Sequence, residues 1–107
     1  MKYLLNSAVL PAGDYGLYRY SPATVKDLTA FLHSGGYVSR IGYPETAEYI
    51  YSLTGIRPSI SRKISNLKPG DSAMVVRLRY RIDPAYKGAS IDPRPEDWEI
   101  GLLVRES

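Results

Sequence analysis

The chain has 107 residues, 44% of them hydrophobic, and a formal net charge of +3, which is typical of one small domain over residues 1–107. With no cysteine and one histidine, the composition excludes disulfides and thiol catalysis and argues against a zinc site, so we expect neither a metal nor a cofactor. No stretch reaches the ~20 apolar residues of a membrane span and the first apolar run is too short for a signal peptide, so we expect a cytoplasmic protein.

The first third of the chain predicts two strands and a helix. Residues 3–6 and 16–20 have the pattern of short strands, and a Pro-Ala-Gly-Asp turn lies between them. Ser21 is a typical N-cap and Pro22 a typical first helical residue, so we expect a helix to begin there and to end at the glycine pair 35–36. Its expected buried stripe has helical spacing: Val25, Leu28, Phe31 and Leu32.

A third strand and a second helix follow. Residues 37–41 predict a strand, and Pro44 predicts the start of a helix because proline lacks an N–H that the first turn leaves unpaired anyway. We expect this helix to run to Leu53 and to stop at Gly55. Tyr43 stands immediately before it, where free backbone amides and the helix dipole favour an anion.

The remainder of the chain predicts mainly strands. Residues 59–65 are expected to form one, residues 72–81 the longest one and residues 98–104 the last one, while residues 83–97 are rich in proline, glycine and charge and predict a loop. Strands outnumber helices and alternate with them only in part. The sequence therefore predicts an α+β fold in which two main helices pack on a mixed sheet.

Three arginines alternate along the predicted strand 72–81. Because a strand repeats each face every two residues, Arg77, Arg79 and Arg81 would form a stripe about 13 Å long. Such a stripe needs counter-charge, and two interpretations stay open. A ligand with several phosphates supplies it, or acidic side chains from loops such as 83–97 do. The ten tyrosines of the chain add surfaces on which bases can stack.

The run Ile41-Gly42-x-x-x-Thr46-Ala47 resembles the signature of the viral ring nuclease family, type III anti-CRISPR proteins that degrade cyclic tetra-adenylate. Shorter segments along most of the chain are also similar to segments of that family, and they occur in the same order as in the family. They comprise the opening residues Tyr3–Ser7, the pair Ser61-Arg62, the turn Lys68–Asp71, Arg81, and the closing residues Trp98–Leu103.

The resemblance implies a homodimer that binds a cyclic oligoadenylate in a cleft across its two-fold axis and so antagonises type III CRISPR signalling. In the family the 2′-hydroxyls of the ring attack the adjacent phosphates without a metal, a histidine protonates the departing 5′-oxygen and an arginine steadies the developing charge. Tyr43 stands at the position of that histidine and Arg81 at that of the arginine, and these are the predicted catalytic residues. The predicted ligand-binding residues are Asn6, Ser7, Gly42, Arg62, Arg77 and Arg79.

A tyrosine at the histidine position changes the expected chemistry. A phenol in water titrates near pH 10 and an imidazole near 6.5, so the phenol is a proton donor at neutral pH but a weaker acid. Three outcomes stay open: a slow ring nuclease, a sponge that sequesters the messenger, or a binder of a different ring. No glutamate follows Arg81 in the family's register. An alternative of another class is a general single-stranded nucleic-acid-binding module that uses the arginines and tyrosines.

Overall fold

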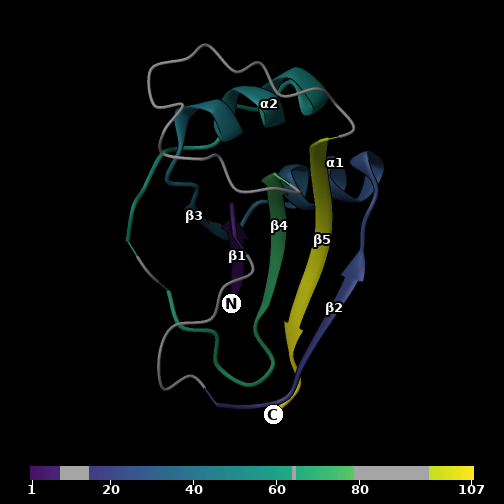
Figure 1. The fold of residues 1–107 in the computed structure, drawn as a ribbon, viewed down its shortest axis with the longest axis vertical. Coiled ribbons are helices and arrows are strands. Elements are labelled where there is room, and N and C mark those ends of the chain that lie inside the picture. Colours follow the sequence, from purple (N-terminus) through teal and green to yellow (C-terminus); the bar gives the residue numbers. More distant parts are fainter. Residues whose placement is uncertain (8–14, 64, 79–96) are drawn as a thin grey trace.

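The structure is a computed structural model, and it describes residues 1–7, 15–63, 65–78 and 97–107. Within these ranges the chain folds into one five-stranded mixed sheet with two helices (Figure 1), which confirms the predicted α+β fold. The elements in chain order are β1 (Lys2–Leu5), β2 (Tyr18–Pro22), α1 (Val25–Ser34), β3 (Tyr37–Arg40), α2 (Pro44–Thr54), β4 (Ser72–Leu78) and β5 (Trp98–Arg105).

The sheet has the strand order β2-β5-β4-β1-β3. Strand β1 lies in the middle of a parallel trio, with β3 on one side and β4 on the other, whereas β5 runs antiparallel to both β4 and β2. Leu5 at the end of β1 is paired with Arg40 at the end of β3. The residues that follow these two strands therefore leave the sheet at the same edge.

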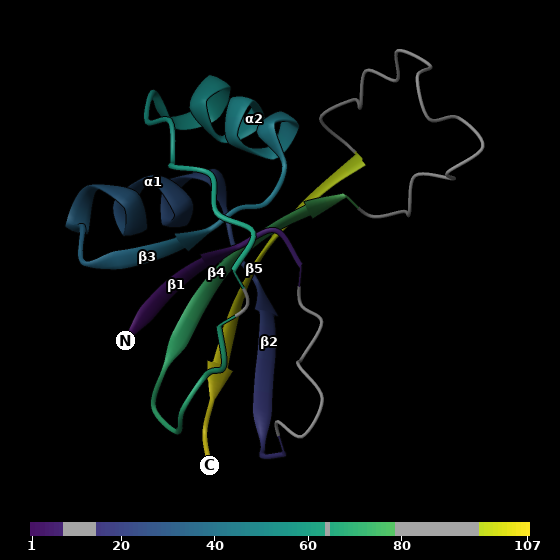
Figure 2. The same ribbon diagram turned by 90° about the vertical axis from the view of Figure 1, so that its left-hand side faces the viewer.

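Both helices cover the same face of the sheet, as Figure 2 shows. The larger core cluster lies between the helices and this face. It consists of Leu4, Leu28, Leu32, Ile41, Ala47, Ile50, Met74, Val76 and Trp98. A smaller cluster lies on the opposite face, where Leu67 packs on side chains from three strands: Tyr3, Ala73, Val75 and Leu103. Neither α1 nor α2 is long and apolar enough to cross a membrane, and the rest of the described chain contains no such helix.

The prediction that Ser21 and Pro22 begin the first helix is wrong. Both residues belong to β2, where they are paired with β5, and the helix begins three residues later. Thr24 is its N-cap: the Thr24 hydroxyl accepts the Asp27 amide at 3.1 Å, and the Asp27 carboxylate accepts the Thr24 amide at 2.9 Å. This reciprocal pair satisfies two amides and fixes the start. Pro22 is tolerated in β2 because an edge strand does not need every N–H.

The second helix was predicted correctly. It begins at Pro44 and ends at Thr54, and Gly55 follows in the left-handed conformation, with its N–H bonded to the carbonyl of Tyr51 at 2.9 Å. Thr46, Ala47 and Ile50 form its buried face.

The strand predicted at residues 59–65 is not present in the described part of that segment. Ile60 makes one isolated bridge to Ile41, and the Ser61 N–H donates to the Ile41 carbonyl at 2.8 Å. The segment therefore runs beside the end of β3 without forming a ladder. This contact brings Ser61 and Arg62 to the edge at which β1 and β3 end.

The strand predicted at residues 72–81 is confirmed as β4 over Ser72–Leu78, while residues 79–81 and most of the predicted loop 83–97 lie outside the described residues. The last strand is confirmed as β5.

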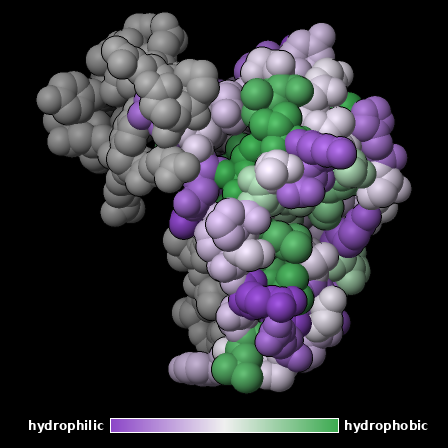
Figure 3. All heavy atoms as spheres, turned by 90° about the vertical axis from the view of Figure 1, so that its right-hand side faces the viewer, coloured by the Kyte–Doolittle hydropathy of each residue, from purple (hydrophilic) through white to green (hydrophobic). Residues whose placement is uncertain are grey.

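Figure 3 shows the molecule from the side of β2, and hydrophobic and hydrophilic residues are interspersed along that face.

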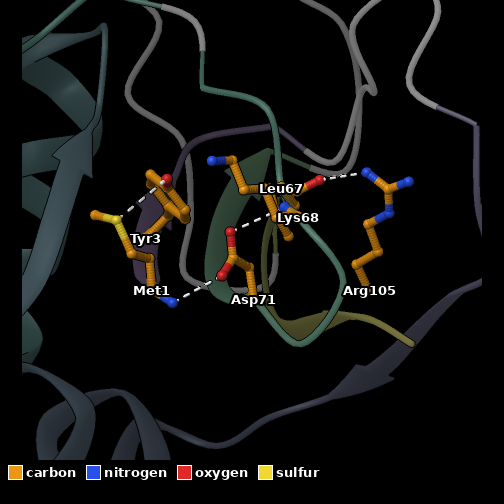
Figure 4. A network of polar contacts seen from close by, with 6 residues as sticks. All are labelled: Met1, Tyr3, Leu67, Lys68, Asp71 and Arg105. Carbon is orange, nitrogen blue, oxygen red and sulfur yellow. Dashed lines mark hydrogen bonds and ion pairs between the residues drawn. The ribbon is translucent and has the colours of Figure 1, made fainter. Parts of the chain in front are cut away.

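A polar network ties β1 to β4 at the opposite, amino-terminal edge of the parallel strands (Figure 4). The Asp71 carboxylate accepts the N-terminal ammonium of Met1 at 2.7 Å and the Lys68 N–H at 2.9 Å. Nearby, Arg105 donates to the Leu67 carbonyl at 2.6 Å. The two bonds to Asp71, above all that from the ammonium, hold its pKa below the usual value.

Asp71→Asn is expected to destabilise the protein at neutral pH but not in acid. Because the pKa of Asp71 is lower in the folded state, its ionised form stabilises the fold; this contribution is complete above the ordinary carboxyl pKa of about 3.9 and is lost as the pH falls through the folded value. Urea unfolding of both proteins between about pH 6 and about pH 2 measures this. The difference in unfolding free energy should shrink toward the acid end, and a difference independent of pH would contradict the assignment.

Candidate ligand-binding site

A hollow of about 300 Å³ opens at the edge where β1 and β3 end. Open sheets commonly bind ligands at the carboxyl ends of their parallel strands, and this hollow has that position. Three chain segments line it: the residue after β1, the passage from β3 into α2, and the segment beside β3. The lining residues are Asn6, Arg40, Gly42, Tyr43, Ser61, Arg62 and Lys63.

Four of the predicted site residues meet here: Asn6, Gly42, Tyr43 and Arg62. The Gly42 N–H donates to Oδ1 of Asn6 at 3.2 Å, and Nε of Arg62 donates to the Gly42 carbonyl at 3.2 Å. A Cβ at Gly42 would lie 3.5 Å from Cγ of Arg62 and 4.0 Å from Oδ1 of Asn6. A side chain at this position would therefore project among the lining residues, and glycine keeps that space free.

Tyr43 is the N-cap residue of α2, with φ −121° and ψ 128°. Its backbone carbonyl accepts the Ala47 N–H at 3.3 Å, whereas its side chain makes no capping bond. The residue is 58% exposed. A tyrosine that served only to pack would be covered, so this exposure favours a role for the phenol at the mouth of the hollow.

The lining carries positive charge, and the described residues offer it no carboxylate partner. Arg40, Arg62 and Lys63 form no salt bridge with any described residue, and none of the described lining residues is acidic. Arginines elsewhere in the described chain do have such partners: Arg19 with Glu106 at 3.2 Å, Arg57 with Glu48 at 2.7 Å and Arg77 with Glu99 at 2.7 Å. Guanidinium and ammonium groups gathered in this way suit an anion, and phosphate in particular.

The comparisons with known proteins identify the family. A family model described as STIV B116-like matches residues 2–92. The chain belongs to the STIV B116-like family. Its fold is similar to that of B116 of Sulfolobus turreted icosahedral virus, with a TM-score of 0.71 and 14% identity over 97% of this chain and 98% of that chain. At this identity the likeness shows the fold alone. Among proteins with curated descriptions, no sequence matches.

The family is described after a viral protein. The resemblance found in the sequence was also to a viral family. In this STIV B116-like chain, the remaining predicted site residues lie elsewhere or are not described. Ser7 follows Asn6 but does not line the hollow. Arg79 and Arg81 lie outside the described residues, so their predicted roles stay predictions.

Arg77 has a partner on the neighbouring strand. It is paired with Glu99 across β4 and β5, and Nε of Arg77 donates to the Glu99 carboxylate at 2.7 Å, which raises the pKa of Arg77. The hydroxyl of Tyr20 donates to the same carboxylate at 3.0 Å, and the Arg77 guanidinium lies 5.2 Å from the Tyr20 ring centre. Burial, followed by that hydrogen bond, raises the pKa of Tyr20. For Arg77 the counter-charge thus comes from within the sheet.

Two cations of the site, Arg40 and Lys63, were missed from the sequence. Arg40 is the last residue of β3, directly before the Ile-Gly run, and this adjacency is the signal that could have found it. Lys63 gives no local signal, because its place depends on the contact between its segment and β3. The described residues contain no group of three or more histidine, cysteine or acidic side chains that could hold a metal ion.

Proposed function

We propose that this STIV B116-like protein binds a cyclic oligoadenylate, with cyclic tetra-adenylate as the expected ring, and removes it by sequestration or by slow cleavage. The observation that carries this proposal is the hollow in which Arg40, Arg62 and Lys63 have no described acidic partner and lie beside the exposed Tyr43. The resemblance of residues 37–55 to ring nucleases supplies the ligand class.

The geometry suggests a role for each side chain. Phosphate oxygens would meet the guanidinium of Arg62 and the free amides of the first turn of α2. Asn6 uses its Oδ1 for the Gly42 amide, so its side-chain NH₂ is the end available to a base or ribose. The phenol of Tyr43 can stack on a base or donate a hydrogen bond to the ring.

The proposed cleavage uses the ring, the Tyr43 phenol and water. A 2′-hydroxyl oxygen bonds to the adjacent phosphorus as the bond from phosphorus to the 5′-oxygen breaks. The 2′-hydroxyl proton passes to water, and the departing oxygen takes a proton from the Tyr43 phenol, which later regains one from water. The product is linear and ends in a 2′,3′-cyclic phosphate.

The size of the hollow supports binding by a homodimer. About 300 Å³ is at the lower end of the range that holds one drug-sized ligand, so a single hollow accommodates only part of a ring of four nucleotides. Two copies related by a two-fold axis present two such hollows, and a symmetric ring has matching halves. The proposal therefore expects one ring for every two chains.

The test incubates the protein in excess over cyclic tetra-adenylate and resolves the products by chromatography, with calorimetry for the stoichiometry. A linear product supports a ring nuclease, and an intact ring that stays bound supports a sponge. No binding at micromolar ring overturns the proposal. Tighter binding of linear single strands that increases with their length would favour the general nucleic-acid-binding alternative instead. The ion pair of Arg77 with Glu99 counts against that alternative, because it removes one member of the arginine stripe.

A further inference from the structure

Arg40 reaches the hollow from the face of the sheet that the helices leave uncovered. It shares that face of β3 with Val38, which packs on the smaller core cluster, because alternate residues of a strand point the same way. Tyr43, by contrast, stands at the start of a helix on the other face. A ligand in the hollow would thus be contacted from two directions.

Two hydrogen bonds fix the guanidinium of Arg40. Its Nε donates to Oγ of Ser65 at 2.7 Å, and its Nη1 donates to the carbonyl of Ser39 at 3.1 Å. A guanidinium has five N–H donors, so these two bonds leave three, and no described carboxylate lies within ion-pair distance. The group is therefore charged, oriented and able to donate further.

The other arginine of the hollow is anchored in the same manner. Nε of Arg62 is bonded to the Gly42 carbonyl, which leaves the far end of that guanidinium for a ligand. Lys63 differs, because its only hydrogen bond among the described residues runs from its backbone N–H to Oγ of Ser61 at 3.4 Å. A fixed fork loses less conformational entropy on binding an anion than a free lysine side chain does.

We propose that Arg40 binds a phosphodiester of the ligand and that Ser65 is the positioning residue that orients it. The identity of the ligand rests on the proposed function; the assignment of a phosphate to Arg40 rests on the geometry above. The competing explanation is structural: the bond from Arg40 to Ser65 ties the segment beside β3 to the sheet and touches no ligand.

The experiment measures the affinity for cyclic tetra-adenylate at several salt concentrations, together with the melting temperature of each variant. Arg40→Ala should weaken binding about tenfold or more and lower the slope of log K against log salt by about 1. Arg40→Lys should restore the slope but only part of the affinity, since it keeps the charge and loses the fork.

Ser65 is tested by a matched pair of substitutions. Ser65→Ala should weaken binding about threefold with an unchanged salt slope, because the charge remains but its orientation is lost. Ser65→Thr keeps the hydroxyl and should retain the affinity of the wild type. Lys63→Ala is the control, because it removes a positive charge that no side-chain hydrogen bond to a described residue holds in place. We expect it to lower the affinity less than Arg40→Ala does.

The results separate this inference from the proposed function. If the wild type binds the ring and both Arg40 variants bind it equally well, the assignment of Arg40 is wrong while the proposed function stands. If the wild type does not bind the ring, the proposed function fails, and inorganic tripolyphosphate becomes the probe. Weaker tripolyphosphate binding by Arg40→Lys then still supports a phosphate contact, and unchanged binding overturns it. If Arg40→Ala does not fold, the affinities of Arg40→Lys and Ser65→Ala decide whether Arg40 contacts the phosphate.

Discussion

Replacing Tyr43 with histidine is expected to raise the rate of ring cleavage at pH 7 by about 10²-fold. General acid catalysis contributes ~10²–10⁴-fold, and its efficiency is greatest when the acid titrates near the working pH. An imidazole titrates near 6.5, whereas a free phenol titrates near 10. Single-turnover cleavage of cyclic tetra-adenylate, with protein in excess, measures the effect. The exposed side chain of Tyr43 makes no capping bond, so the substitution should leave the melting temperature unchanged.

The pH dependence of the cleavage rate is a second test of the Tyr43→His variant. Only the protonated imidazole donates a proton, so the rate of Tyr43→His should fall as the pH rises above about 7. Tyr43→Phe is the matched control, because it keeps the ring and removes the hydroxyl. It should bind the messenger but not cleave it if the phenol is the acid. A histidine variant no faster than the wild type would show that this side chain does not reach the departing oxygen.

The position of Tyr43 before α2 could be predicted because it depends on local signals. Pro44 and the glycine before Tyr43 mark the start of a helix within a few residues, so the position of Tyr43 followed from its neighbours alone. The parallel pairing that brings Asn6 beside Gly42 is different, because it joins residues 36 positions apart. The local pattern contains no signal for this pairing, so Asn6 and Gly42 were assigned to one site through the resemblance to a known family.

The wrong start of the first helix has a non-local origin as well. Ser21 and Pro22 are good helix starters taken alone, but pairing with β5 holds them in a strand and leaves Thr24 to form the capping box. For Arg77 the sequence leaves open whether a ligand or an acidic side chain supplies the counter-charge, and the register of β4 and β5 places Glu99 opposite it. At both positions a contact with a distant strand decides the structure, and no local pattern shows it.

Arg62→Ala is expected to weaken binding of the ring by about 10- to 100-fold. Its guanidinium is held by the Gly42 carbonyl, lines the hollow and has no described carboxylate partner, so removing it deletes a charge-assisted contact of about 1.5–3 kcal/mol. Equilibrium titration with cyclic tetra-adenylate at fixed salt measures the loss. The Gly42 carbonyl is exposed to water at the hollow once the side chain is removed, so the fold should tolerate the change.

Arg57→Ala is the matched control for this experiment. Arg57 also carries an exposed guanidinium, but it is paired with Glu48 at 2.7 Å and stacks on the Tyr51 ring at 4.1 Å, away from the hollow. Because that substitution changes the net charge equally, it corrects for long-range attraction of a polyanion. A loss confined to Arg62→Ala places the ring in the hollow. Equal losses in both variants would mean that only net charge attracts the ligand, and the hollow would not be its binding site.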